Sequence, residues 1–209
     1  MNMNNKIYSL YKELYKKHGV SPEAVKARNS AQQKNRFEYL LSCAQIQKND
    51  SILDVGCGSG EMLNYLRINE YKGFYCGVDF LSEFVEHAND IYKKDKKSKF
   101  IEMDVTTENF TESYDWVMLS GVFNDLREDS EVFFYSMIEK MFKASNKGII
   151  FNSLTKYVDY EDENLFYTYP DKVIKYCFEN LSKYIVLNTN YQLKEKTIPF
   201  EYSLCVYKK

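Results

Sequence analysis

SILDVGCGSGEML, residues 51–63, is the stretch of the sequence that decides the fold. Its first five residues form a short apolar run with β-branched members, which is typical of a buried parallel strand. Glycines then occupy the alternate positions Gly56, Gly58 and Gly60, and a helical pattern begins at Glu61. A strand, a glycine turn and a helix in this order let a ligand approach the backbone closely at a helix N-terminus.

A second predicted strand, residues 74–78, supports a nucleotide-type ligand. It ends at Asp79, and a carboxylate about 20 residues beyond the last glycine is where a cofactor ribose is typically held. The dinucleotide fingerprint would need its third glycine at the position of Glu61, and the lysine of a phosphate-binding P-loop is absent. The spacing therefore excludes both of these common fingerprints.

DVGCGSG, residues 54–60, followed by Asp79, resembles motif I and the next acidic strand end of class I S-adenosylmethionine (SAM)-dependent methyltransferases. The resemblance continues in three further blocks: the glutamine–arginine–phenylalanine helix at 32–37, SGVFN at 120–124, and VDYEDENLFY at 158–167. It implies an α/β fold, a doubly wound, seven-stranded and mostly parallel sheet with an antiparallel last strand and two helices prepended. It also implies SAM as the cofactor.

Length and composition agree with one domain of this kind. The 209 residues divide into an N-terminal helical addition, 1–48, and a Rossmann-like core, 49–209. Five cysteines without a C-x-x-C pair predict reduced thiols in the cytoplasm and no metal site. No apolar run approaches the roughly 20 residues of a membrane span, so no membrane partner is expected.

The hydrophobic pattern predicts the remaining elements. Gly148 is expected to turn the chain into the fifth core strand. Further strands are expected at 99–105, 114–119, 149–152, 184–188 and 201–207, and helices at 4–18, 30–46, 61–68, 82–92, 131–142 and 171–181.

The predicted cofactor-binding residues follow core strands at their carboxyl ends, apart from one arginine on the second helix. The glycine turn is expected at the methionine end of SAM, and Asp79 on the ribose hydroxyls. The resemblance assigns the adenine to Asp104 and the backbone amide of Val105, with an acidic cap of the following turn as the alternative for Asp104. The full set is Arg36, Asp54, Gly56, Gly58, Gly60, Asp79, Phe80, Asp104, Val105, Ser120 and Gly121.

Arg36 is interpreted from helical spacing. It follows Gln33 by three residues and Gln32 by four, so the three side chains can share one face of the helix. If that face meets the cofactor crevice, Arg36 can pair bidentately with the carboxylate of the methionine part of SAM. The alternative is an ordinary surface arginine. The N-terminal helices together could cover the crevice.

The catalytic candidates follow from the reaction. Methyl transfer needs an acceptor atom held in line with the methyl group, and a hydroxyl acceptor often needs a general base as well. No histidine falls in the loops after the fourth and fifth strands, so the candidates are carboxylates and phenols: Asp125, Tyr157, Asp159, Tyr160 and Asp162. The acidic segment is interpreted either as a solvated loop or as a lid over a hydroxylated or cationic acceptor.

The expected reaction is methyl transfer to an oxygen or nitrogen of a small-molecule acceptor. A nucleic-acid substrate is disfavoured because the Asp/Asn-Pro-Pro-aromatic and Pro-Cys signatures are absent and an acidic loop would repel phosphates. A protein substrate and a non-catalytic SAM-binding module stay open as alternatives.

Overall fold

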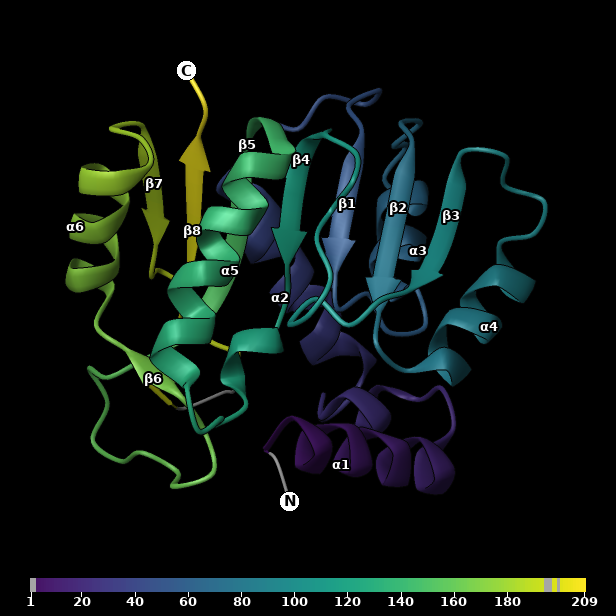
Figure 1. Cartoon of the computed structure of the whole chain (residues 1–209), viewed down its shortest axis with the longest axis horizontal. Coiled ribbons are helices and arrows are strands. Elements are labelled where there is room, and N and C mark those ends of the chain that lie inside the picture. Colours follow the sequence, from purple (N-terminus) through teal and green to yellow (C-terminus); the bar gives the residue numbers. More distant parts are fainter. Residues whose placement is uncertain (1–2, 194–196, 199) are drawn as a thin grey trace.

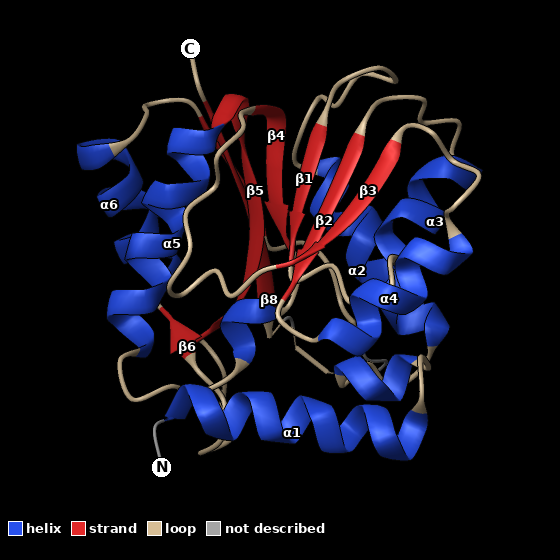
Figure 2. Ribbon diagram, turned by 45° about the vertical axis from the view of Figure 1, so that its right-hand side comes forward, coloured by secondary structure: helices blue, strands red, loops and turns tan. Residues whose placement is uncertain are grey.

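The computed structural model describes residues 3–193, 197–198 and 200–209, and its sheet lies between two layers of helices (Figures 1 and 2). The strand order is β3-β2-β1-β4-β5-β8-β7, and β8 runs antiparallel to both of its neighbours. This confirms the predicted doubly wound sheet with an antiparallel last strand. The short strand β6, which pairs with β5, is an addition to the seven predicted strands.

The bounds of the elements are as follows. The strands are β1 Ile52–Val55, β2 Tyr75–Asp79, β3 Ser98–Glu102, β4 Tyr114–Leu119, β5 Ser145–Thr155, β6 Tyr167–Thr168, β7 Ile185–Asn188 and β8 Glu201–Tyr207. The helices are α1 Met3–His18, η1 Pro22–Val25, α2 Ser30–Ser42, α3 Glu61–Ile68, α4 Ser82–Ile91, η2 Val122–Asn124, α5 Ser130–Ala144 and α6 Pro170–Asn180. No helix among the described residues is long and apolar enough to cross a membrane.

The alternation of side chains along the central strands builds two cores, one on each face of the sheet. Trp116 and Met118 of β4 face the layer formed by α2, α3 and α4, whereas Val117 and Leu119 face α5 and α6. All four are at most 2% exposed. The central strands are therefore buried on both faces, as a parallel sheet requires.

Gly148 corrects one prediction. It is not a turn before the fifth strand but lies inside β5, which begins at Ser145 and is longer than predicted. A Cβ atom at this position would come 2.5 Å from the carbonyl oxygen of Val206 on the neighbouring β8. The glycine is needed because two strands approach closely there, which a single-sequence pattern does not distinguish from a turn.

The two N-terminal helices have different places in the fold. α2 packs through Phe37 and Leu40 into the core that contains Trp116. α1 lies across the carboxyl ends of the parallel strands (Figures 1 and 2). Together with η1 it packs on a small separate cluster around Ala24, Leu81 and Phe84. We call residues 6–28, which comprise most of α1, η1 and the chain up to Arg28, the N-terminal cover.

Candidate active site

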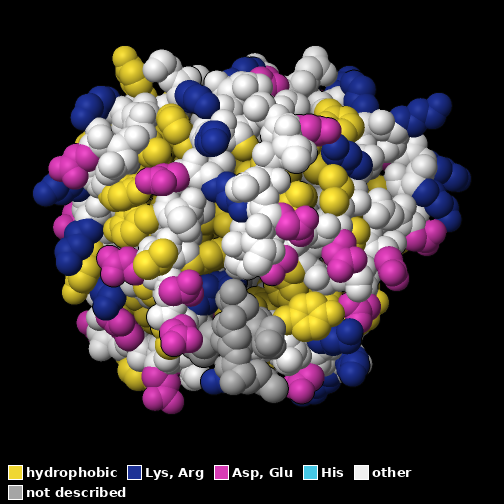
Figure 3. Space-filling view, in the orientation of Figure 1, with side chains coloured by type: hydrophobic (Ala, Val, Ile, Leu, Met, Phe, Trp, Pro, Cys, Tyr) yellow, Lys and Arg dark blue, Asp and Glu magenta, His cyan; other side chains and the backbone are white. Residues whose placement is uncertain are grey.

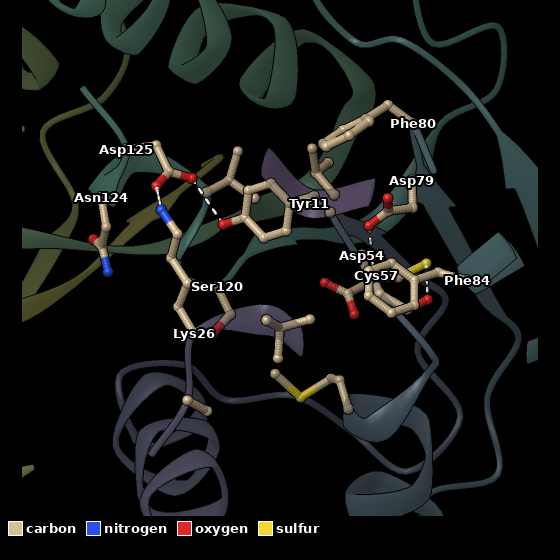
Figure 4. Close-up of a pocket in the computed structure, with 18 of the residues that line it drawn as sticks. Tyr11, Lys26, Asp54, Cys57, Asp79, Phe80, Phe84, Ser120, Asn124 and Asp125 are labelled. Carbon is tan, nitrogen blue, oxygen red and sulfur yellow. Dashed lines mark hydrogen bonds and ion pairs between the residues drawn. The ribbon is translucent and has the colours of Figure 1, made fainter. Parts of the chain in front are cut away.

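A cavity of about 950 Å³ lies at the carboxyl ends of the central strands, beneath the N-terminal cover (Figure 4). All of the predicted cofactor-binding residues line it except Gly60. The carboxyl ends of parallel strands are where open α/β sheets bind their ligands. The structure therefore brings ten residues that are widely separated in the sequence to one place.

The glycine turn after β1 forms the floor of the cavity. Gly56 has a φ of 74°, and a Cβ atom there would overlap the side chain of Val122 in the loop after β4. Gly60 has a φ of 86° and is the N-cap of α3, where a Cβ atom would lie 2.9 Å from the ring of Tyr92. Both glycines are required by the left-handed backbone and by crowding, so the turn keeps its backbone open to a ligand.

Asp79 joins the glycine turn to the end of β2. Its carboxylate accepts hydrogen bonds from the backbone amides of Gly58, at 2.9 Å, and Leu81, at 3.0 Å. A carboxylate has about four lone-pair positions, so two bonds leave acceptor capacity for the hydroxyls of a ribose. Burial raises the pKa of Asp79 to about 6.

Asp54 is the second buried carboxylate of the floor. It is 2% exposed and accepts a hydrogen bond of 2.5 Å from the hydroxyl of Tyr75. Burial, and secondarily the charge of Asp79, raises the pKa of Asp54 to about 7, although the Tyr75 hydroxyl opposes the shift. The floor therefore gathers acidic groups that a cationic ligand would stabilise in their ionised form.

Asp104 lines the cavity after β3 and also caps the next turn. Its Oδ1 accepts from the backbone amide of Thr106 at 2.9 Å and from the hydroxyl of the same residue at 2.6 Å. Asp104 therefore does cap the following turn. Because Asp104 also lines the cavity, its contact with the adenine of SAM stays a prediction.

Arg36 reaches the cavity from α2, but its guanidinium already has a partner. It forms an ion pair with Glu201 of β8, with Nη2 3.1 Å from Oε2 and Nε donating to both carboxylate oxygens at 3.2 Å. The side chain of Glu201 is only 1% exposed. Arg36 is therefore not an ordinary surface arginine. A contact with the cofactor carboxylate stays a prediction and would use Nη1, the guanidinium nitrogen in none of these contacts.

Asp125 stands at the other end of the cavity and is approached from the N-terminal cover (Figure 4). The hydroxyl of Tyr11 donates to its Oδ2 at 2.8 Å, and the Nζ atom of Lys26 donates to its Oδ1. Burial and the adjacent carboxylate raise the pKa of Tyr11 well above its usual value. We call Tyr11, Lys26 and Asp125 the Asp125 cluster.

The other four catalytic candidates do not line the cavity. Tyr157 and Tyr160 are 60% and 76% exposed, and the hydroxyl of Tyr157 donates to Asp171 at 2.7 Å. Asp159 is exposed, and Asp162 accepts from the amide of Asn164 within its own loop. The interpretation of the acidic segment as a lid is therefore abandoned in favour of a solvated loop.

The end of the same segment nevertheless supports the site through its backbone. Leu165 forms a bridge with Asp125, and the amide of Phe166 donates to the carbonyl of Asn124 at 3.0 Å. The segment thus holds the loop that carries Asp125, while Asp159 and Asp162 do not line the cavity. Of the predicted catalytic residues, Asp125 is the one that the structure places in the cavity wall.

Several functional candidates could not have been found in the sequence. Tyr11 and Lys26 are separated from Asp125 by 114 and 99 residues, and neither belongs to a motif. Arg127, which is 9% exposed and lies over the ring of Phe133 at 4.2 Å, also lines the cavity. Only the folded chain brings these side chains together.

The comparisons with known proteins agree with this geometry. Residues 52–144 match the family described as "Methyltransferase domain". The protein named "Putative methyltransferase Rv1506c" of Mycobacterium tuberculosis is 30% identical over 154 residues, which cover 71% of this chain and 90% of that protein.

Two solved structures show the same fold at low sequence identity. The "DhpI-SAM-HEP complex" superposes with a TM-score of 0.70, at 12% identity and 98% coverage of both chains. The magnesium protoporphyrin IX methyltransferase ChlM of Synechocystis PCC 6803, solved with bound SAM, has a TM-score of 0.62 at 15% identity, covering 97% of this chain and 91% of that one.

The glycine turn, the acidic strand ends and the sheet order define a class I methyltransferase fold with a built cofactor site. The chain belongs to the class I SAM-dependent methyltransferases. Its cofactor is accordingly SAM, and the residues present fit that group, since the glycine turn leaves room beside the backbone and Asp79 offers acceptors to a ribose.

Proposed function

We propose that the protein transfers a methyl group from SAM to an oxygen or nitrogen of a small-molecule acceptor bound beside the Asp125 cluster. The observation that carries the proposal is the closed position of the N-terminal cover. Tyr8, Tyr11, Val25 and Lys26 line the cavity opposite the strand ends. A folded protein or a nucleic-acid duplex could reach the floor only by displacing this cover, whereas a small molecule fits beneath it.

The polar groups at the Asp125 end suit an acceptor that carries a donor. Asn124 lines the cavity, and its side-chain oxygen is buried without a hydrogen-bond partner among the described residues. Buried acceptors are normally satisfied in a folded protein. A hydroxyl or amine of the acceptor molecule would supply the missing hydrogen, and both groups are chemically suited to methylation.

The described residues divide the work of the reaction. When bound, SAM supplies an electrophilic methyl group on a sulfonium. The glycine turn, Asp79 and Asp104 hold the cofactor half of the cavity. The loop from Ser120 to Asp125 positions the acceptor, and the N-terminal cover excludes water from between the reactants.

Asp125 remains the candidate base nearest to the acceptor end. Both of its oxygens already accept hydrogen bonds from the N-terminal cover, one from Tyr11 and one from Lys26. This arrangement favours an acceptor that is already reactive, such as a neutral amine or an acidic hydroxyl. Asp125 would then orient the acceptor rather than remove its proton.

The experiment is a turnover assay with methyl-labelled SAM and a fractionated small-molecule extract. Release of S-adenosylhomocysteine that depends on one low-molecular-weight fraction would support the proposal. Label found only in RNA or protein, and removed by ribonuclease or protease, would contradict it. Binding of SAM with no product in any fraction would favour the non-catalytic module.

The surface gives the nucleic-acid alternative little support. On the face drawn in Figure 3, the described Lys and Arg side chains are interspersed with Asp and Glu and do not form a continuous basic field. The chain as a whole carries a net charge of −2. Non-specific nucleic-acid affinity depends on many basic contacts to phosphate.

Two of the structurally similar proteins have a small substrate or a substrate analogue in their names. The magnesium protoporphyrin IX methyltransferase is one, and the plantazolicin methyltransferase BpumL, solved with a desmethyl-plantazolicin analogue, is another, with a TM-score of 0.59 at 14% identity. At this identity they support the architecture of the site and leave the acceptor of this chain to experiment.

A further inference from the structure

We propose that Tyr11 and Lys26 are positioning residues that act through Asp125, closing the N-terminal cover over bound cofactor and thereby setting how fast the cofactor leaves. The inference rests on the proposed function only for the place of SAM in the cavity. It assigns a role to two residues that lie outside the sequence blocks that carry the resemblance, at 32–37, 54–60, 120–124 and 158–167.

The first argument is that, within the cover, α1 is held to the rest of the fold by few buried side chains. Among residues 6–18 of α1, Ile7 alone is fully buried, and Tyr8 and Leu10 are each 38% exposed. Besides the hydrogen bond to Asp125 and an ion pair between Lys12 and Glu83, α1 contacts the rest of the fold through aromatic rings. Tyr11 meets Phe80 edge-on at 5.8 Å, and Tyr15 meets Phe84 at 5.3 Å. An element with few buried side chains opens at a small fraction of the global unfolding free energy.

The second argument is the position of the Asp125 cluster. Asp125 is 6% exposed, and both of its oxygens accept hydrogen bonds from the cover. Lys26 also lies 5.4 Å from the centre of the Tyr11 ring, so the three side chains form one contact. Hydrogen bonds with a charged partner are about twice as strong as neutral ones. The cluster is therefore a charge-assisted contact that joins the cover to the loop after β4.

The third argument is the backbone at Lys26. It has a φ of 58°, in the left-handed region that a residue with a side chain rarely adopts. This conformation ends η1 and is compatible with the contact between its side chain and Asp125. A strained backbone conformation of this kind persists only where the surrounding contacts stabilise it, and such positions are common at ligand-binding sites.

The fourth argument is what the cover meets directly. A Cβ atom at Gly58 of the glycine turn would lie 3.4 Å from the side chain of Val25 in η1. Phe80, which follows the ribose-holding Asp79, packs against Tyr8 and Tyr11. The cover thus touches the two segments that are expected to hold the cofactor, and cofactor exchange requires it to move away from both.

The test measures the release of S-adenosylhomocysteine, which needs no knowledge of the acceptor. Bound labelled product is chased with unlabelled product in the wild type and in the Tyr11→Phe and Lys26→Met variants. Each variant removes one hydrogen bond to a carboxylate, so we expect the dissociation rate to rise about tenfold or more. The matched control is Lys12→Met, because Lys12 lies on the same helix, outside the cavity, in an exposed ion pair with Glu83 at 3.4 Å. Its rate should stay within about threefold of the wild type.

A second readout separates closure from general stability. Hydrogen exchange of the amides in residues 8–17 should slow when S-adenosylhomocysteine binds the wild type and should slow much less in Tyr11→Phe. The urea midpoint of the core should be the same in both proteins, because α1 lies outside the two main cores. Unchanged release rates in both variants would overturn the proposal, as would a fall in the core midpoint that accounts for the faster release. A wild type that binds the product normally but methylates no small molecule would instead contradict the proposed function alone.

Discussion

α1 and α2 are neighbours in the sequence, yet the fold uses them in opposite ways. α2 buries Phe37 and Leu40 in the core and places Arg36 on Glu201, which is almost fully buried. α1 buries a single side chain among residues 6–18 and meets the loop after β4 through Tyr11 on Asp125. The comparison teaches that the N-terminal addition is not one unit. One helix belongs to the layer that supports the sheet, and the other can open over the cofactor.

The largest expected effect concerns the ion pair of α2. Arg36→Met leaves the Glu201 carboxylate buried without its cation, which should lower the free energy of unfolding by about 3–5 kcal/mol. Lys26→Met should cost less, because the side chain of Lys26 is 36% exposed and that of Arg36 is 16% exposed. Urea denaturation of both variants measures the difference. Equal losses of unfolding free energy in the two variants would contradict the different roles assigned to α2 and to the N-terminal cover.

A double variant distinguishes a structural role of Arg36 from a role in cofactor binding. Arg36→Met combined with Glu201→Gln removes both charges and should recover most of the lost stability. If Arg36 also holds the carboxylate of SAM, the affinity for S-adenosylhomocysteine should stay low in the double variant. Recovery of both stability and affinity would show that the arginine serves only the fold.

The next effect tests hydrophobic burial on the same two helices. Leu40 of α2 is fully buried, so Leu40→Ala should lower the free energy of unfolding by about 2–5 kcal/mol. Leu10 of α1 is 38% exposed, and Leu10→Ala should change it by no more than about 0.5 kcal/mol. Thermal denaturation gives both values. A comparable loss for Leu10→Ala would mean that α1 is part of the folding core.

The floor beneath the cover is tested at Asp79. Asp79→Ala removes a charged acceptor for the ribose, at roughly 1.5–3 kcal/mol, so affinity for SAM should fall about 10- to 150-fold in calorimetry. Asp90→Ala is the control, since Asp90 forms an exposed ion pair with Lys93 outside the cavity. Unchanged affinity in Asp79→Ala would contradict the ribose assignment.

The effect of pH on SAM affinity should be smaller than that of Asp79→Ala, and the affinity should fall as the pH falls. Burial raises the pKa of Asp79 to about 6, so lowering the pH from 7.5 to 5 converts most of the apo protein to the protonated acid. If the ribose is held by the carboxylate, affinity should fall about tenfold over this range, since pH 5 is one unit below the pKa. Asp79→Asn should remove the part of the dependence centred near pH 6 and leave any part due to Asp54, whose pKa is raised to about 7 by burial. A wild-type affinity that rises as the pH falls would contradict the assignment.

The smallest effect is expected at the exposed contact of α1. Glu83→Gln removes the ion pair with Lys12, whose side chain is 38% exposed, and should change the free energy of unfolding by less than about 1 kcal/mol. It should also leave the release rate of S-adenosylhomocysteine near that of the wild type. A large change in either quantity would show that the ion pair between Lys12 and Glu83, and not the Asp125 cluster, holds the cover.

The fold class and the cofactor could both be predicted from the sequence. Both depend on local patterns. The strand, the glycine turn and Asp79 lie within about 30 positions of one another, and their spacing and backbone conformation specify a cofactor site. Gly56 and Gly60 show why: their left-handed backbone and the crowding at their Cβ positions leave glycine as the residue that fits. Gly148 marks the limit of such reasoning, since its cause is a strand far away in the sequence.

Which polar groups line the cavity beside Asp125 could be seen only in the folded chain. Asp159 and Asp162 belong to the segment that follows β5, but they do not line the cavity, whereas Leu165 of the same segment lines it and pairs with the backbone of Asp125. Tyr11 and Lys26 meet Asp125 because α1 crosses the carboxyl ends of the strands. No local pattern encodes that crossing: it depends on the packing of aromatic side chains across the whole fold, and a hydrogen bond between residues more than 90 positions apart exists only once that packing is complete.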